Sequence, residues 1–123
     1  MVAPKIILVV DDDKMNREIE QFYLERNGYT VFPAASGAEA LTLLEQHPIH
    51  LVLTDFNMPG MKGDELAKHI QMHYPGLPIM LVSSDRHLAD YAHALNIQFM
   101  EKPIQLSKFL HVIESILTAH YGI

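Results

Sequence analysis

The stretch IILVVDDD at residues 6–13 joins five consecutive apolar residues directly to three acids. A short apolar run rich in valine and isoleucine is typical of a strand that is covered on both faces in a parallel sheet. Three further runs end in the same way, each at a polar side chain: 51–54 at Asp55, 79–82 at Ser83 and 97–101 at Lys102. The sequence therefore predicts strands whose carboxyl ends carry acids, a hydroxyl and an amine.

Amphipathic segments of helical length separate these runs. A shorter apolar run at 29–32 completes the set of predicted strands. The predicted helices are 14–27, a segment from Ser36 to about Pro48, 64–72, 88–95 and 107–119. In the first helix Met15, Ile19 and Phe22 form one apolar stripe, as expected of a helix that packs on a sheet.

The alternation of strand and helix, repeated five times, predicts an α/β fold. Right-handed crossovers leave few topologies open. The best fit is a flavodoxin-like, doubly wound, five-stranded parallel sheet with strand order 2-1-3-4-5 and five helices, in a single domain of residues 1–123. In this order Asp11, Asp12 and Asp55 lie together at the edge where open α/β sheets bind their ligands.

The composition of the chain excludes several classes of function. A net charge of −6 without a basic stripe argues against nucleic-acid binding. The absence of cysteine excludes disulfides, thiol catalysis and cysteine-ligated zinc. We find neither an apolar stretch of the ~20 residues that a membrane span needs nor a signal peptide, and expect a cytoplasmic protein without membrane insertion. We also expect no effector domain in this chain.

Three neighbouring carboxylates remain ionised only if a cation neutralises them. Mg²⁺ suits such a cluster because one or two carboxylates, waters and a substrate phosphate usually hold it. Asp11 and Asp12 would then bind the ion together with Asp55. The alternative is that Asp12 or Asp13 only caps the first helix.

Asp55 is the candidate reactive group, since a carboxylate can attack phosphorus and hold the phosphoryl group as an acyl phosphate. Such a transfer mainly requires positioning and charge stabilisation from the protein. Lys102 would neutralise one phosphoryl oxygen, and the Ser83 hydroxyl would donate to another. A solvated loop lysine and an ordinary serine at a strand end are the alternatives, but their joint occurrence at successive strand ends favours the functional interpretation.

Four segments, at residues 8–12, 55–63, 82–84 and 102–103, closely resemble the receiver domain of two-component response regulators, in order and with similar spacing. The likeness to this family, whose members include chemotaxis regulators, extends nearly from end to end. It implies a phosphorelay switch that accepts a phosphoryl group on Asp55 from a sensor histidine kinase or a histidine phosphotransfer protein. It also implies that the chain catalyses only its own phosphorylation and dephosphorylation and is not otherwise an enzyme.

The resemblance assigns roles to individual residues. It implies Mg²⁺, with Mn²⁺ as a substitute, held by Asp11, Asp12, Asp55 and the backbone carbonyl of Asn57. Lys102 would pair with the phosphoryl group, and the bond from Lys102 to the following proline would be cis.

Other residues would transmit the signal. Ser83 and Phe99 would be the switch residues, while Asn57 and Asp85 would tune the lifetime of the phosphorylated form, which we expect to be minutes. The surface of helix 4, strand 5 and helix 5 would contact a downstream target or an attached output domain. Helices 4 and 5 would also provide a possible homodimer interface.

The chain departs from the family pattern at a few positions. Lys62 stands where many relatives carry an acid, Ser83 replaces the commoner threonine, and Phe99 replaces a tyrosine. The interval 83–102 is shorter than usual, which affects the expected signalling face more than the phosphorylation site. The alternative for Phe99 is a plain core aromatic.

Competing functions fit the sequence less well. An aspartyl phosphatase of the haloacid dehalogenase type needs an acid two residues after its nucleophile, where this chain has Asn57. A flavin or nucleotide binder would need a first loop that does not repel phosphates. A receiver that only docks partners is a further alternative. His69 and His73 have zinc-binding spacing on one helix, but without an evident third ligand we expect surface histidines.

Overall fold

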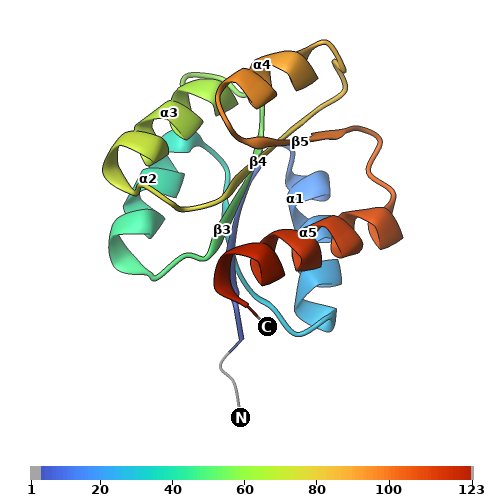
Figure 1. Ribbon diagram of the computed structural model, residues 1–123. Helices are drawn as coiled ribbons and strands as arrows, with labels where there is room; N and C mark the ends of the chain where they lie inside the picture. The colour runs from blue at the N-terminus through green and yellow to red at the C-terminus, as the bar shows by residue number, and fades with distance from the viewer. Residues whose placement is uncertain (1–3, 123) are drawn as a thin grey trace.

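Strands and helices alternate throughout residues 4–122, the part of the chain that the computed structural model describes (Figure 1). The strands are β1 (Ile6–Val10), β2 (Thr30–Ala34), β3 (Leu51–Asp55), β4 (Ile79–Ser83) and β5 (Gln98–Glu101). The helices are α1 (Lys14–Arg26), α2 (Gly37–Gln46), α3 (Gly63–His73), α4 (Leu88–Ala94) and α5 (Leu106–Tyr121). The strands pair in parallel in the order β2-β1-β3-β4-β5, which confirms the predicted fold.

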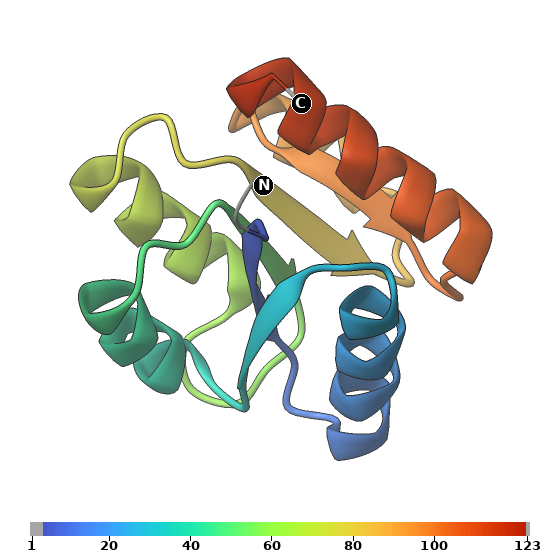
Figure 2. The same ribbon diagram turned by 90° about the horizontal axis from the view of Figure 1, so that it is seen from below.

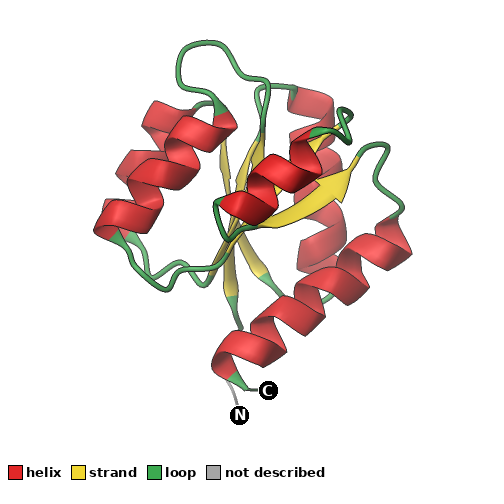
Figure 3. Ribbon diagram, turned by 45° about the horizontal axis from the view of Figure 1, so that its top comes forward, coloured by secondary structure: helices red, strands yellow, loops and turns green. Residues whose placement is uncertain are grey.

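Helices cover both faces of the sheet (Figures 2 and 3). Leu8 and Val10 of β1 belong to the apolar cluster formed with α2, α3 and α4, whereas Ile7 and Val9 belong to the cluster formed with α1 and α5. Because successive strand side chains point to opposite faces, a strand covered on both sides needs an uninterrupted apolar run. This is why the β1 sequence shows no polar alternation.

The apolar stripe predicted for α1 does not face the sheet. The side chains of Met15, Ile19 and Phe22 are 70%, 47% and 62% exposed, whereas Glu20 and Leu24 are buried. Successive helical residues are about 100° apart around the axis, so the buried stripe is offset by one position from the predicted one. The expectation that 15, 19 and 22 pack on the sheet was therefore wrong.

The element boundaries differ from the predicted ones by one or two residues. Asp55 and Ser83 are the last residues of β3 and β4 and not the first residues beyond them. β2 continues through Pro33 to Ala34, which is acceptable because β2 lies at the edge of the sheet. Among the described residues, no helix is both long and apolar enough to cross a membrane.

Candidate phosphoacceptor site

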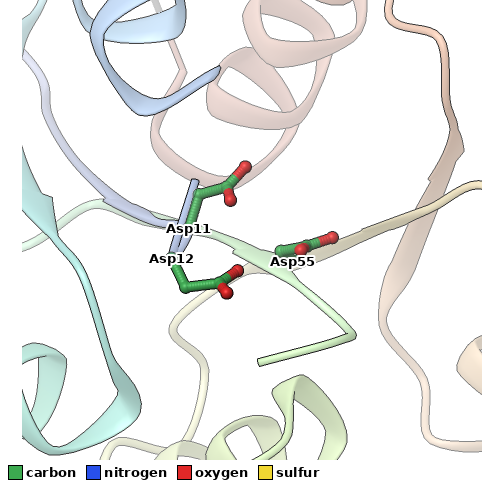
Figure 4. A group of neighbouring side chains, drawn as sticks. All are labelled: Asp11, Asp12 and Asp55. Atoms are coloured by element: carbon green, nitrogen blue, oxygen red, sulfur yellow. The ribbon is translucent and has the colours of Figure 1, made fainter. Parts of the chain in front are cut away.

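Three aspartates gather at the carboxyl ends of β1 and β3 (Figure 4). Asp11 and Asp12 directly follow β1, and Asp55 ends the neighbouring strand β3. One carboxylate oxygen from each lies within 4.8 Å of those of the other two. Asp11 is buried, Asp55 is half-buried and Asp12 is exposed. The predicted juxtaposition of these side chains is therefore present.

Local hydrogen bonds separate the roles of the three consecutive acids. Asp13 caps α1, where its Oδ1 accepts from the Asn16 amide at 3.0 Å. Asp11 Oδ1 accepts from the Asp13 amide at 2.9 Å, and its carbonyl oxygen accepts from Arg17 Nη1 at 2.7 Å. The capping alternative therefore applies to Asp13, and the carboxylates of Asp11 and Asp12 remain directed to the cluster with Asp55.

Lys102 supplies positive charge to this cluster. Its Nζ lies 3.0 Å from Asp55 Oδ1 and 3.8 Å from Asp11 Oδ2. Its backbone amide donates to the Ser83 carbonyl at 2.9 Å, which fixes the residue beside the end of β4. The following peptide bond, Lys102–Pro103, is cis, as the resemblance implied.

Burial and charge act in opposite directions on the titration of the pocket. Burial raises the pKa of Asp11, and the hydrogen bond from Asp13 and the charge of Lys102 offset only part of this rise. Burial also tends to lower the pKa of Lys102, but the hydrogen bond and charge of Asp55, together with the charges of Asp11 and Glu20, outweigh it, and the net shift is upward. Lys102 therefore remains an ammonium, and the excess of acids over one lysine favours a further cation.

The donor set fits a hard divalent cation. All three clustered side chains offer carboxylate oxygen, which Mg²⁺ prefers. Oxygens about 2.1 Å from an octahedral ion lie at most about 4.2 Å apart, so only a small adjustment of this cluster is needed. Among residues 4–122, nothing donates a hydrogen bond to the Asn57 carbonyl, which leaves that predicted ligand available.

The predicted switch residues lie on β4 and β5. Ser83 is 1% exposed, and its Oγ accepts from the Asp85 amide at 3.1 Å. Phe99 is half-buried and packs against the cluster on the α2, α3 and α4 face. Asn57 and Asp85, predicted to tune the lifetime of the phosphorylated form, are both exposed to water.

Gly63 is a site residue that the sequence analysis did not identify. Its amide donates to the Phe56 carbonyl at 2.9 Å, and an added Cβ would clash with the Asp55 carbonyl oxygen. Glycine thus allows the start of α3 to approach the backbone of the central acid. The sequence signals were a glycine eight residues after a strand-end acid and its place at the end of the segment 55–63 that resembles receiver domains, neither of which assigned Gly63 a role.

Glu20 is the second residue that was missed. It is 7% exposed and lies on the sheet-facing side of α1; the charge of Asp11 contributes to the raised pKa of Glu20, and the charge of Glu20 contributes to the raised pKa of Lys102. The sequence places it four residues before Leu24, on the stripe that proves to be buried. Choosing this stripe over the more apolar one requires the tertiary structure.

The histidine pair on α3 has no third partner in the described part of the chain. The rings of His69 and His73 stack with centroids 4.2 Å apart, and His73 Nδ1 lies 3.0 Å from the His69 carbonyl oxygen. Among residues 4–122, the aspartate cluster is the single group of three or more potential metal-ligating acids or histidines. A zinc site at the pair is thus not supported.

Comparison with known proteins places this fold and pocket in one class, the response regulator receiver domain, whose family model matches residues 7–114. The chain therefore belongs to the response regulator receiver family. Members of this family are phosphoacceptors of two-component signalling, bind Mg²⁺ at an acidic pocket and interact with histidine kinases and output domains.

Individual relatives support this assignment. The transcriptional regulatory protein GlrR of Escherichia coli is 31% identical over 117 residues, which cover 93% of this chain and 26% of GlrR. The chemotaxis protein CheY4 of Vibrio cholerae has a TM-score of 0.87 at 27% identity, covering 93% of this chain and 99% of that one. TrrA of Thermotoga maritima, solved in complex with Mg²⁺-BeF, has a TM-score of 0.84 at 27% identity, covering 91% and 98%.

The relatives differ in length. This chain spans between 26% and 52% of the first curated relatives that it matches. It spans nearly all of the solved receiver structures. The similarity therefore concerns the receiver domain itself.

Proposed function

We propose that this chain is a phosphoacceptor switch in which Asp55 receives a phosphoryl group from a histidine kinase or phosphotransfer protein. The observation that supports this most strongly is the Asp55 carboxylate with Lys102 Nζ 3.0 Å away and two further carboxylates beside it. A purely structural ion pair would not need Asp11 and Asp12 as additional negative charge. A divalent cation would neutralise the excess negative charge, and the cation together with Lys102 would then stabilise an added phosphoryl group.

In the proposed transfer, an Asp55 oxygen attacks phosphorus as the bond from phosphorus to the donor imidazole nitrogen breaks. The electron pair of that bond goes to the imidazole, and the product is an acyl phosphate on Asp55. Lys102 stabilises one phosphoryl oxygen, which requires its ammonium to turn from the carboxylate to the new group. Bound Mg²⁺, or Mn²⁺ in its place, would neutralise charge on the phosphoryl oxygens, with Asp11, Asp12, Asp55 and the Asn57 carbonyl as ligands.

The phosphodonor docks on the exposed face of α1. Met15, Ile19 and Phe22 are exposed there and, with Leu106 at the start of α5, line a hollow of about 640 Å³. Ile19 and Leu106 also line the neighbouring hollow that contains Lys102, so the apolar surface continues to the phosphoacceptor pocket. An apolar helix face of the donor would bury this patch and bring its histidine to Asp55.

Phosphorylation changes the surface of α4, β5 and α5. A phosphoryl group on Asp55 offers strong acceptors to the Ser83 hydroxyl, which then leaves its contact with the Asp85 amide. Movement of the β4–α4 segment makes room for Phe99 to turn inward, and the domain shifts population between two packings. This surface controls a downstream target or an attached output domain, and α4 and α5 provide a possible dimer interface.

The chain acts on itself and not on external substrates: it catalyses its own phosphorylation and dephosphorylation. Asn57 and Asp85 lie exposed near the pocket, where they can order the attacking water. We expect a phosphorylated lifetime of minutes, and a half-life of a day in buffer with Mg²⁺ would contradict this role.

Intact mass after incubation with acetyl phosphate tests the proposal. Wild type with Mg²⁺ is expected to gain one phosphoryl group, and both Asp55→Asn and removal of Mg²⁺ are expected to abolish the gain. Asp13→Asn is the matched control, because asparagine also caps helices and this residue caps α1. A gain that Asp55→Asn retains, or no gain in wild type, would refute the assignment.

A further inference from the structure

Glu20 is a buried acid that the proposed transfer does not use. It lies on the sheet-facing side of α1 and is only 7% exposed. Among residues 4–122, no hydrogen bond or ion pair is formed by its carboxylate, whereas buried acids usually have such partners. Among residues 4–122, no Glu20 oxygen is a fully buried atom that lacks a partner, so the carboxylate reaches solvent at a hollow, although burial of the residue disfavours its charge.

Glu20 lines the same hollow as Lys102, the lysine of the phosphoacceptor pocket. This hollow, of about 490 Å³, is lined by Glu20, Lys102 and Ser84, with Ile104 and Leu106 among its apolar residues. Glu20 from α1 and Lys102 from the segment after β5 therefore line one hollow without forming an ion pair, while Asp55 and Asp11 pair with the Lys102 ammonium from the ends of the strands.

The charges of the two groups interact. Burial raises the pKa of Glu20 to about 7, the charges of Asp11 and Asp55 add to the rise, and Lys102 opposes it. In turn, the Glu20 charge contributes to the upward shift of the Lys102 pKa. Glu20 is not part of the three-aspartate cluster, so it does not act as one of the predicted metal ligands.

We propose that Glu20 is a positioning residue that draws the Lys102 ammonium towards α1 and adds negative charge beside Asp55. This inference rests on the proposed phosphoacceptor function and adds a regulator of the same site. When ionised, Glu20 competes with an incoming phosphoryl group for Lys102 and repels that group. It also increases the attraction of the aspartate cluster for a divalent cation. The residue therefore shifts the balance of the pocket from anion binding towards cation binding.

Glu20→Gln tests this balance because it removes the charge and retains the shape. Glu18→Gln, on the exposed side of the same helix, is the matched control for loss of one negative charge. Dissociation constants are measured first for Mg²⁺ alone and then for beryllofluoride with saturating Mg²⁺, above the Glu20 pKa. Circular dichroism verifies the fold, and Glu20→Leu, which suits the apolar lining, serves as a second variant.

Glu20→Gln is expected to weaken Mg²⁺ binding and tighten beryllofluoride binding, each by about threefold or more, because a nearby charge acts oppositely on a cation and an anion. The Lys102 ammonium resonance in ¹⁵N NMR should shift in Glu20→Gln and stay in place in Glu18→Gln. Unchanged constants, shifts of both constants in the same direction, an equal response of the control or an unmoved Lys102 resonance would overturn the proposal. A wild type that binds Mg²⁺ without binding beryllofluoride would instead refute the phosphoacceptor function.

Discussion

Removing the buried charge of Glu20 should make the protein more stable at neutral and alkaline pH. The pKa of this carboxyl rises from 4.5 to about 7 in the folded chain, chiefly because of burial. Each unit of pKa corresponds to ~1.4 kcal/mol, so ionised Glu20 lowers the free energy of unfolding by about 3 kcal/mol. This is a large fraction of the stability of a small domain, which is typically about 5–15 kcal/mol.

The sign of the pH dependence follows from proton binding. Between pH 4.5 and about 7, the folded chain holds a proton on Glu20 that the unfolded chain has lost. The contribution of Glu20 to the free energy of unfolding is therefore fully present at low pH and is lost as the pH rises through that interval. Glu20→Gln lacks this ionisable carboxyl, so its free energy of unfolding relative to wild type should rise by about 2.5 kcal/mol from about pH 5 to about pH 8.

Urea unfolding with EDTA, followed by circular dichroism, measures this difference. The comparison at each pH cancels the contributions of groups that do not interact with Glu20. Glu18→Gln removes an exposed acid from the same helix and should follow the wild-type pH dependence. An equal difference between Glu20→Gln and wild type at both pH values would show that burial does not raise the Glu20 pKa, and would refute the reasoning.

Three further predictions concern the pocket and its supports. Gly63→Ala should lower the free energy of unfolding by about 2 kcal/mol or more in urea, because the added methyl clashes with the Asp55 carbonyl; an unchanged midpoint would show that the loop relaxes freely. Mg²⁺ should raise the melting temperature of wild type in a concentration-dependent manner, and Asp11→Asn should reduce this increase. An equal increase in Asp11→Asn would show that Asp11 is not a ligand of the ion. Tyr91→Phe should lower the free energy of unfolding, measured in urea, by about 1–3 kcal/mol. The Tyr91 hydroxyl donates to Asp64 Oδ2 at 2.7 Å, and Asp64 Oδ1 is already buried without a partner. A smaller loss would mean that water replaces the hydroxyl.

The local pattern of apolar and polar residues was sufficient to predict the strands of the sheet. The apolar runs before Asp11, Asp55 and Ser83 became β1, β3 and β4; right-handed crossovers left few strand orders open, and the flavodoxin-like order that fitted best is the one observed. Because parallel strands end at a common edge, the sequence alone was sufficient to place the aspartates and Lys102 together. These features depend on residues adjacent in sequence and on general rules of connection.

The sequence by itself thus determined the fold, the strand order and the identity of the clustered polar side chains. Only the tertiary structure decided which stripe of α1 is buried, because α1 packs on one side of the sheet beside α5, which is remote in sequence. That packing exposed Ile19, buried Glu20 beside Lys102 and left Glu20 without a direct partner. Periodicity measures where apolar residues lie on a helix, but the surfaces that surround the helix determine which face loses water.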